Sequence, residues 1–217
     1  MRVLVLAFVV AVIGCGGHPS PPPHGVIQAD LGPWKYRRYQ PVLDVEVWVD
    51  NNKAEAFTAS YVADAAEQAG HIAENNVVNV FVTRYTTDIG VLRETVKFAR
   101  RLAAEQGYQV DESKISGART LTINGHGESW VMWASKGYVV KVGGRGLDSV
   151  PSGLVGSYAD RYPSVMPGGV LEGPLPPGPD DKPKQDAKQP YDSNNPTPDL
   201  DKYDPNKSKL PAKKKED

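Results

Sequence analysis

Three short segments of strand-like sequence follow one another between residues 115 and 142, separated by glycine-containing turns. The segments are 115–123, 128–134 and 138–142, and the turns are Asn124-Gly125-His126-Gly127 and Ser135-Lys136-Gly137. Turns as short as these join neighbouring strands in antiparallel fashion. The sequence therefore predicts a three-stranded antiparallel meander, which any fold of this chain must accommodate.

Two strand-then-helix patterns precede the meander. Apolar residues alternate with other residues in 43–49 (LDVEVWV), which predicts a half-buried strand, and residues 57–72 carry an apolar stripe at helical spacing. Residues 77–85 are rich in β-branched and aromatic side chains, which predicts a second strand. Residues 88–106 again have the apolar stripe of an amphipathic helix.

A short helix is predicted after the meander. It starts near Ser149 with Pro151 in its first turn, where the missing N–H of proline costs nothing, and it ends at Tyr162-Pro163. The predicted order is β-α-β-α-β-β-β-α. This order indicates an α+β domain of two layers, a mixed β-sheet with helices packed on one face. A short doubly wound α/β domain is the alternative.

Both ends of the chain differ from this patterned middle. The chain has 21 glycines and 19 prolines among 217 residues, and ten of the prolines lie in residues 171–217. Lysines and acidic residues are mixed along the same stretch, and apolar residues are sparse. A segment of this composition buries too little surface to offset its ordering entropy, so we expect residues 167–217 to form a disordered tail.

The amino terminus has the layout of a secretory signal peptide. Arg2 precedes an apolar run from Val3 to Ile13. The run is too short to cross a bilayer, which needs about 20 residues, but it has the length of the apolar region of a signal peptide. The only cysteine of the chain, Cys15, follows directly, so no intramolecular disulfide can form.

The segment Val12-Ile13-Gly14-Cys15 resembles the lipobox of bacterial lipoproteins, with an aliphatic residue, a small residue and then the cysteine. The resemblance covers only the first 17 residues. It implies that the Cys15 sulfur carries a diacylglyceryl group, that cleavage occurs before Cys15, and that the new amine is acylated, for example with palmitate. In Gram-negative lipoproteins an aspartate after the cysteine tends to mean inner-membrane retention, so Gly16 favours the outer membrane, facing the periplasm.

The chain is therefore divided into a signal peptide at 1–14, a lipidated stalk at 15–33, an α+β domain at 34–166 and a tail at 167–217. Polyproline in the stalk favours an extended spacer of roughly 3 Å per residue between bilayer and domain. His18 and His24 flank the prolines, but two histidines on a linker make a poor metal site. We expect no metal and no cofactor.

Charge argues against a nucleic-acid partner. Lys and Arg number 25 against 26 Asp and Glu, and no basic stripe stands out. Aromatic and basic side chains gather at two places that could bind a partner, either another envelope protein or peptidoglycan. The candidate residues are Trp34, Tyr36, Arg37, Arg38 and Tyr39 in the WKYRRY segment, and Trp130, Trp133 and Tyr138 in the meander. The WKYRRY segment reads equally well as the first edge of the domain.

The favoured function is a membrane-anchored, non-catalytic binding or structural module of the cell envelope. Two alternatives remain open. An envelope hydrolase could use His126 as a general base oriented by Glu128, although a hairpin turn explains the same residues. A small-molecule sensor would need a pocket between the sheet and the helices.

Overall fold

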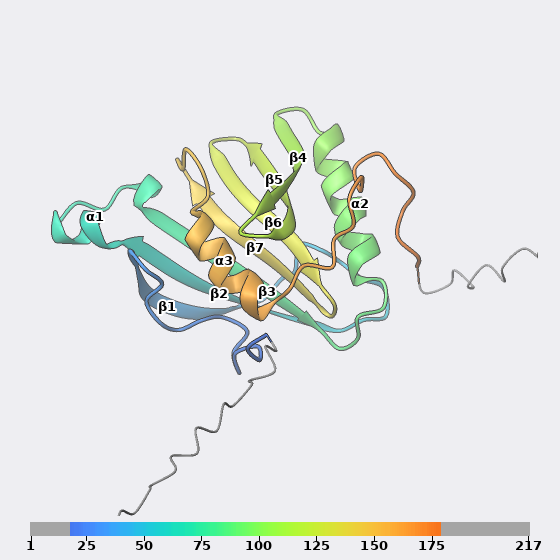
Figure 1. Ribbon diagram of the computed structural model, residues 1–217, viewed down its shortest axis with the longest axis horizontal. Helices are drawn as coiled ribbons and strands as arrows, with labels where there is room; N and C mark the ends of the chain where they lie inside the picture. The colour runs from blue at the N-terminus through green and yellow to red at the C-terminus, as the bar shows by residue number, and fades with distance from the viewer. Residues whose placement is uncertain (1–17, 179–217) are drawn as a thin grey trace, which may run out of the picture. The chain divides into compact units, whose positions relative to one another are not determined.

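The computed structural model describes residues 18–178 (Figure 1). The predicted signal peptide, Cys15 and residues 179–217 of the predicted tail lie outside the described residues. The elements are β1 (Trp34–Val42), β2 (Ala54–Ala63), α1 (Asp64–Gln68), η1 (Glu74–Asn76), β3 (Val77–Tyr85), α2 (Val91–Ala104), β4 (Tyr108–Ile115), β5 (Ala118–Gly125), β6 (Glu128–Ser135), β7 (Tyr138–Arg145) and α3 (Ser152–Arg161).

The seven strands form one sheet in the order β1-β2-β3-β7-β6-β5-β4. The predicted α+β class is confirmed, since three α-helices accompany this sheet. The sheet differs from the predicted mixed sheet because every strand pairing in it is antiparallel. Residues Val131 to Ser135 of β6 are all buried in succession, so both faces of this strand are covered.

The first half of the domain departs most from the sequence prediction. Residues 43–49 are not a strand, and β1 occupies the WKYRRY segment just before them. The first part of the predicted helix at 57–72 belongs to strand β2, and only the short α1 follows it. Pairing of β2 with both β1 and β3 outweighs the helical preference of its alanines, because strand pairing is a tertiary gain that local propensity does not include.

The second half follows the prediction more closely. Strand β3 covers the predicted residues 77–85, and α2 lies within the predicted helix at 88–106. The meander has four strands where three were predicted, because the turn at Ser116-Gly117 divides residues 108–125 into β4 and β5. Strand β4 was missed because it is an edge strand with a mostly polar sequence, YQVDESKI.

The segment before β1 belongs to the domain, which corrects the predicted stalk at 15–33 for its described part. Val26 and Ile27 are buried in the core. The backbone N–H of Ile27 donates to the Tyr158 hydroxyl of α3 at 2.9 Å, and the Tyr162 hydroxyl donates to the carbonyl oxygen of Gly25 at 2.6 Å. Residues 25–27 are therefore fixed against α3, and the domain begins well before Trp34.

The chain after α3 also stays on the domain, beyond the predicted boundary at residue 166. Val170 is buried, and its carbonyl oxygen accepts hydrogen bonds from Nε and Nη2 of Arg100 on α2. Leu171 and Leu175 pack against the core. Figure 1 shows this segment running past α2 after it leaves α3. The described part of the predicted tail, 167–178, is thus attached to α2 and not separate from the domain.

Candidate functional site

Two cations occupy opposite positions on the β4–β5 hairpin at one edge of the sheet. Lys114 of β4 and Arg119 of β5 are directly opposite partners in the strand register. Side chains in such positions have Cβ atoms about 5 Å apart, and like charges placed there destabilise the pair. Among residues 18–178, neither side chain has an ion pair or a hydrogen bond to offset this repulsion.

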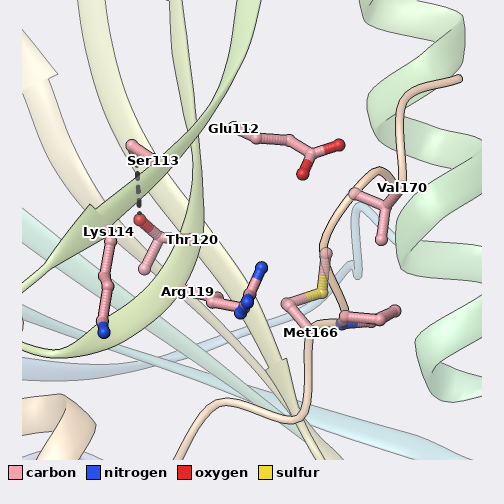
Figure 2. A pocket seen from close by; sticks show the side chains of 8 residues that line it. Glu112, Ser113, Lys114, Arg119, Thr120, Met166 and Val170 are labelled. Carbon is pink, nitrogen blue, oxygen red and sulfur yellow. Dashed lines mark hydrogen bonds between the residues drawn. The ribbon is translucent and has the colours of Figure 1, made fainter.

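Two shallow cavities adjoin this pair of cations. One, of about 290 Å³, lies between the hairpin and the chain after α3, and is lined by Glu112, Ser113, Lys114, Arg119, Thr120, Met166, Pro167 and Val170 (Figure 2). The other, of about 390 Å³, is lined by His18, Lys114, Ser116, Gly117, Ala118, Arg119, Ala159, Asp160, Pro163, Ser164 and Met166. Lys114, Arg119 and Met166 line both, so the two cavities are neighbours.

The segment that follows α3 forms one wall of the first cavity. The Ser164 hydroxyl donates to the carbonyl oxygen of Arg119. The two carboxylate oxygens of Glu112 accept from the backbone N–H groups of Gly169 and Leu171, at 2.7 and 2.9 Å. The carboxylate is therefore bound to backbone, and Arg119, which points toward this segment in Figure 2, is left without a partner among the described residues.

Gly168 makes room for Arg119. A Cβ atom at this position would collide with Nη1 of Arg119, so a larger residue would push the guanidinium out of its place. On the hairpin itself, the Ser113 hydroxyl lies 2.8 Å from the hydroxyls of both Thr120 and Thr122. These hydrogen bonds join the two strands beside the cation pair. They do not involve Lys114 or Arg119, whose charged ends are available to a ligand.

His18 brings the amino-terminal end of the described chain to the second cavity. Its Nδ1 lies 3.0 Å from the backbone carbonyl oxygen of Asp160 at the end of α3. Arg161 donates to the carbonyl oxygen of Ser20 at 3.1 Å. His18 follows Cys15 by three residues, which span at most about 11 Å when fully extended.

The five candidate residues of the WKYRRY segment form edge strand β1. Trp34, Tyr36 and Tyr39 are half-buried and pack against the core, with Tyr39 stacked on Phe57. Arg37 forms an ion pair with Glu67, and Arg38 is exposed. The segment is thus the first edge of the sheet, and its role in binding a partner stays a prediction.

The three candidate residues of the meander do not form one surface. Trp133 is fully buried, and its Nε1 donates to the carbonyl oxygen of Tyr162 at 2.7 Å, so its prediction as a binding residue is wrong. Tyr138 is half-buried against Tyr162. Trp130 lies on the opposite face of β6 from Trp133, with the Lys141 ammonium 4.1 Å from its ring centroid and Phe81 beside it.

His126 and Glu128 do not form a catalytic pair. His126 is exposed at the tip of the β5–β6 hairpin with φ of 52°, and its ring lies against Tyr108. The carboxylate of Glu128 accepts instead from Trp130 Nε1 at 2.9 Å and from Arg145 Nε at 3.2 Å. The geometry that a His–Glu general base requires is absent from this pair, which removes the observation behind the hydrolase alternative.

One further cavity bears on the sensor alternative. The cavity lined mainly by apolar residues between the β1–β2 loop and the sheet holds only about 70 Å³, which is small for the ligand of a sensor domain. Within residues 18–178, no cluster of histidine, cysteine and acidic residues is arranged to hold a metal ion. No helix in this part of the chain has the length and hydrophobicity of a membrane span.

Sequence reasoning did not identify the cation pair. A missed strand hid it, since Lys114 and Arg119 become neighbours only when the Ser116-Gly117 turn folds β4 onto β5. The signal that could have found it is the serine–glycine step flanked by two basic residues in KISGAR. In comparisons with known proteins, no family model, no curated protein and no solved structure matches this chain.

Proposed function

We propose that this protein is a lipid-anchored module of the bacterial cell envelope that binds another envelope component and performs no catalysis. The anchor is a diacylglyceryl group on Cys15, in the outer membrane and facing the periplasm. The module is the α+β domain of the described residues, and its partner is another envelope protein or peptidoglycan.

The sequence supports the anchor. The order of Arg2, an apolar run, Gly14 and then the only cysteine of the chain is the order that lipoprotein processing requires. Two or three acyl chains hold a protein stably at a bilayer, each buried CH₂ contributing about 0.8 kcal/mol, whereas one chain does so only marginally. A diacylated and N-acylated Cys15 would therefore suffice without any membrane-spanning helix.

The observation that carries the proposal is the short distance along the chain between Cys15 and the folded domain. His18 and Ser20 contact the end of α3, and Ile27 is buried. An anchor at Cys15 would hold the α3 end of the domain against the membrane surface instead of letting it move on a long spacer. The hydrogen bonds of His18 and Ser20 give the anchored domain a defined orientation.

An aromatic and basic cluster supplies a surface for a partner. Phe81, Trp130 and Lys141 lie together on one face of the sheet, and the Lys141 ammonium lies within 6 Å of both rings. The same ammonium forms an ion pair with Glu46 at 2.6 Å, so the aromatic rings are the part of the cluster that a partner would contact. Aromatic side chains beside a cation are common both at protein interfaces and in sites that bind sugars by stacking. Trp130 therefore remains the strongest of the predicted binding residues.

The experiment is a comparison of the wild-type protein with Cys15→Ser in the native host. Labelled palmitate should enter the wild-type protein and be absent from Cys15→Ser, and the variant should lose the membrane fraction that survives a high-salt wash. Ser157→Ala, an exposed change on α3, is the matched control and should behave as wild type. Equal labelling of Cys15→Ser, or a wild-type protein without label, would reject the anchor.

A further inference from the structure

Lys114 and Arg119 are both exposed, and the described chain does not neutralise either of them. Two cations are register partners on adjacent strands, and the described residues provide neither with an acceptor. The nearby carboxylate of Glu112 accepts hydrogen bonds from the backbone N–H groups of Gly169 and Leu171 and forms no ion pair with either cation. An anion placed between the two side chains would turn their repulsion into two charge-assisted hydrogen bonds.

The cavities at this pair have the shape and chemistry for a phosphate group. Arg119 presents a planar fork of N–H donors that matches phosphate oxygens, and Lys114 adds a mobile ammonium. Ser116 and the backbone of the hairpin turn line the same space. The two cavities together are lined by two cations and two carboxylates. Backbone N–H groups already hold the carboxylate of Glu112, so Asp160 is the acidic side chain that would compete with a phosphate.

The location selects the source of the phosphate. His18 lines the larger cavity, and it follows Cys15 by only three residues, at most about 11 Å of extended chain. If Cys15 is acylated as proposed, its glyceryl group lies at the level of the lipid headgroups. The cavity would then be held within reach of those headgroups, where phosphate is abundant.

We propose that the cavities at Lys114 and Arg119 form a binding site for the headgroup phosphate of an anionic phospholipid in the membrane to which the protein is anchored. Arg119 binds the phosphate through its guanidinium, and Lys114 neutralises the remaining charge. Gly168 leaves room for the guanidinium, because a Cβ atom there would collide with it. The site orients the domain on the bilayer and leaves the Trp130 cluster for a partner. The assignment of the lipid as ligand rests on the proposed anchor, whereas the anion site rests on the cation pair alone.

The test uses the full lipoprotein, purified in a neutral detergent and mixed with equal amounts of phosphatidylglycerol and phosphatidylcholine. Native mass spectrometry then counts the phospholipids that each variant retains. The wild-type protein should retain phosphatidylglycerol in preference, and Arg119→Ala and Lys114→Ala should each weaken this retention about tenfold, the expected loss of one hydrogen bond to a charged group. Arg38→Ala removes another exposed arginine, on β1, and should change nothing.

Three results would overturn the inference. The first is equal retention of both lipids by the wild type. The second is retention of phosphatidylglycerol by Arg119→Ala at the wild-type level. The third is complete displacement of the lipid by an excess of inorganic phosphate, which would identify a free-phosphate site instead. The intact mass of the same sample reports separately whether Cys15 is acylated. If Cys15 is acylated but the protein shows no preference for phosphatidylglycerol, only the phosphate site is rejected. If the protein prefers phosphatidylglycerol but Cys15 is not acylated, only the anchor is rejected.

Discussion

The hydroxyl oxygens of Tyr61 and Tyr158 lie 2.8 Å apart in the core and connect strand β2 to helix α3. Both also bind one residue of the segment before β1. The backbone N–H of Ile27 donates to the Tyr158 hydroxyl, Tyr158 donates to Tyr61, and Tyr61 donates to the carbonyl oxygen of Ile27. This closed ring of hydrogen bonds satisfies every polar group of Ile27 without water and fixes the amino-terminal segment to the domain.

Tyr158→Phe should break this ring. The N–H of Ile27 would remain buried without a partner, so we expect the free energy of unfolding to fall by about 1 to 3 kcal/mol. Urea denaturation followed by circular dichroism measures the change. The control is Tyr36→Phe, because the Tyr36 hydroxyl has no hydrogen bond to a described residue and its loss should cost little. Equal effects of the two substitutions would show that the ring contributes nothing.

Alkaline pH should unfold the protein through its buried tyrosines. Burial raises the pKa of Tyr61 to about 12, and it also raises the pKa values of Tyr85, Tyr158 and Tyr162 above the ordinary value. Above pH 10 the unfolded chain loses these protons while the folded protein keeps them. Each such tyrosine then lowers the free energy of unfolding by about 1.4 kcal/mol per pH unit.

The titration is followed by phenolate absorbance and near-ultraviolet circular dichroism together. Stability should be constant below pH 10 and fall between pH 10 and 12, and the buried tyrosines should ionise only as the tertiary signal is lost. A protein whose ten tyrosines all ionise near pH 10 while the tertiary signal persists would contradict the packing described for α3.

Gly143 and Gly153 should respond in opposite directions to alanine. A Cβ on Gly143 would overlap the carbonyl oxygen of Ser129 and lie 2.8 Å from the Cα of Trp130, so Gly143→Ala should destabilise the protein by about 1 to 3 kcal/mol. A Cβ on Gly153, in α3, meets nothing within 4 Å, and Gly153→Ala should stabilise it by up to about 1 kcal/mol. Urea denaturation of both variants checks the signs.

Arg100→Met should release the chain that follows α3. Arg100 donates to the carbonyl oxygens of Val170 and Gly173, and without these bonds the amides of Leu171 and Gly173 should exchange with deuterium several-fold faster. Arg101→Met is the control, since Arg101 lies over Phe98 and does not contact this segment. The attachment of residues 167–175 to α2 is wrong if these amides already exchange at the unprotected rate in the wild type.

Local patterns predicted much of the second half of the fold because most of its strands are joined by short turns, although β3 also pairs with the distant β7. Strand β3, the α2 stripe and the turns at 126–127 and 136–137 each depend on residues near in sequence. Residues 43–49 show why alternation alone misled. Val47 and Val49 are buried and Trp48 is exposed, as predicted, but Leu43 is fully exposed and no neighbouring strand pairs with the segment. Alternation reports an extended backbone, whereas a strand also needs a partner.

The candidate site could not be predicted in the same way. Its members, His18, Lys114, Arg119 and Gly168, come from four separate parts of the chain, and only the folding of β5 onto β4 and of the segments at both ends onto α3 and α2 joins them. The candidate site was also missed because the proline-rich segment was predicted to be a free spacer, separate from the domain. Nothing in a proline run shows that Val26 and Ile27 beyond it are core residues.

The lipid anchor on Cys15 is tested most directly by the intact mass of the mature protein isolated from the membranes of its native host. We expect a polypeptide that begins at Cys15 and carries the added mass of a diacylglyceryl group, with or without a further acyl chain on the new amine. A mature protein that begins elsewhere, or that begins at Cys15 with no lipid attached, would contradict the lipid anchor.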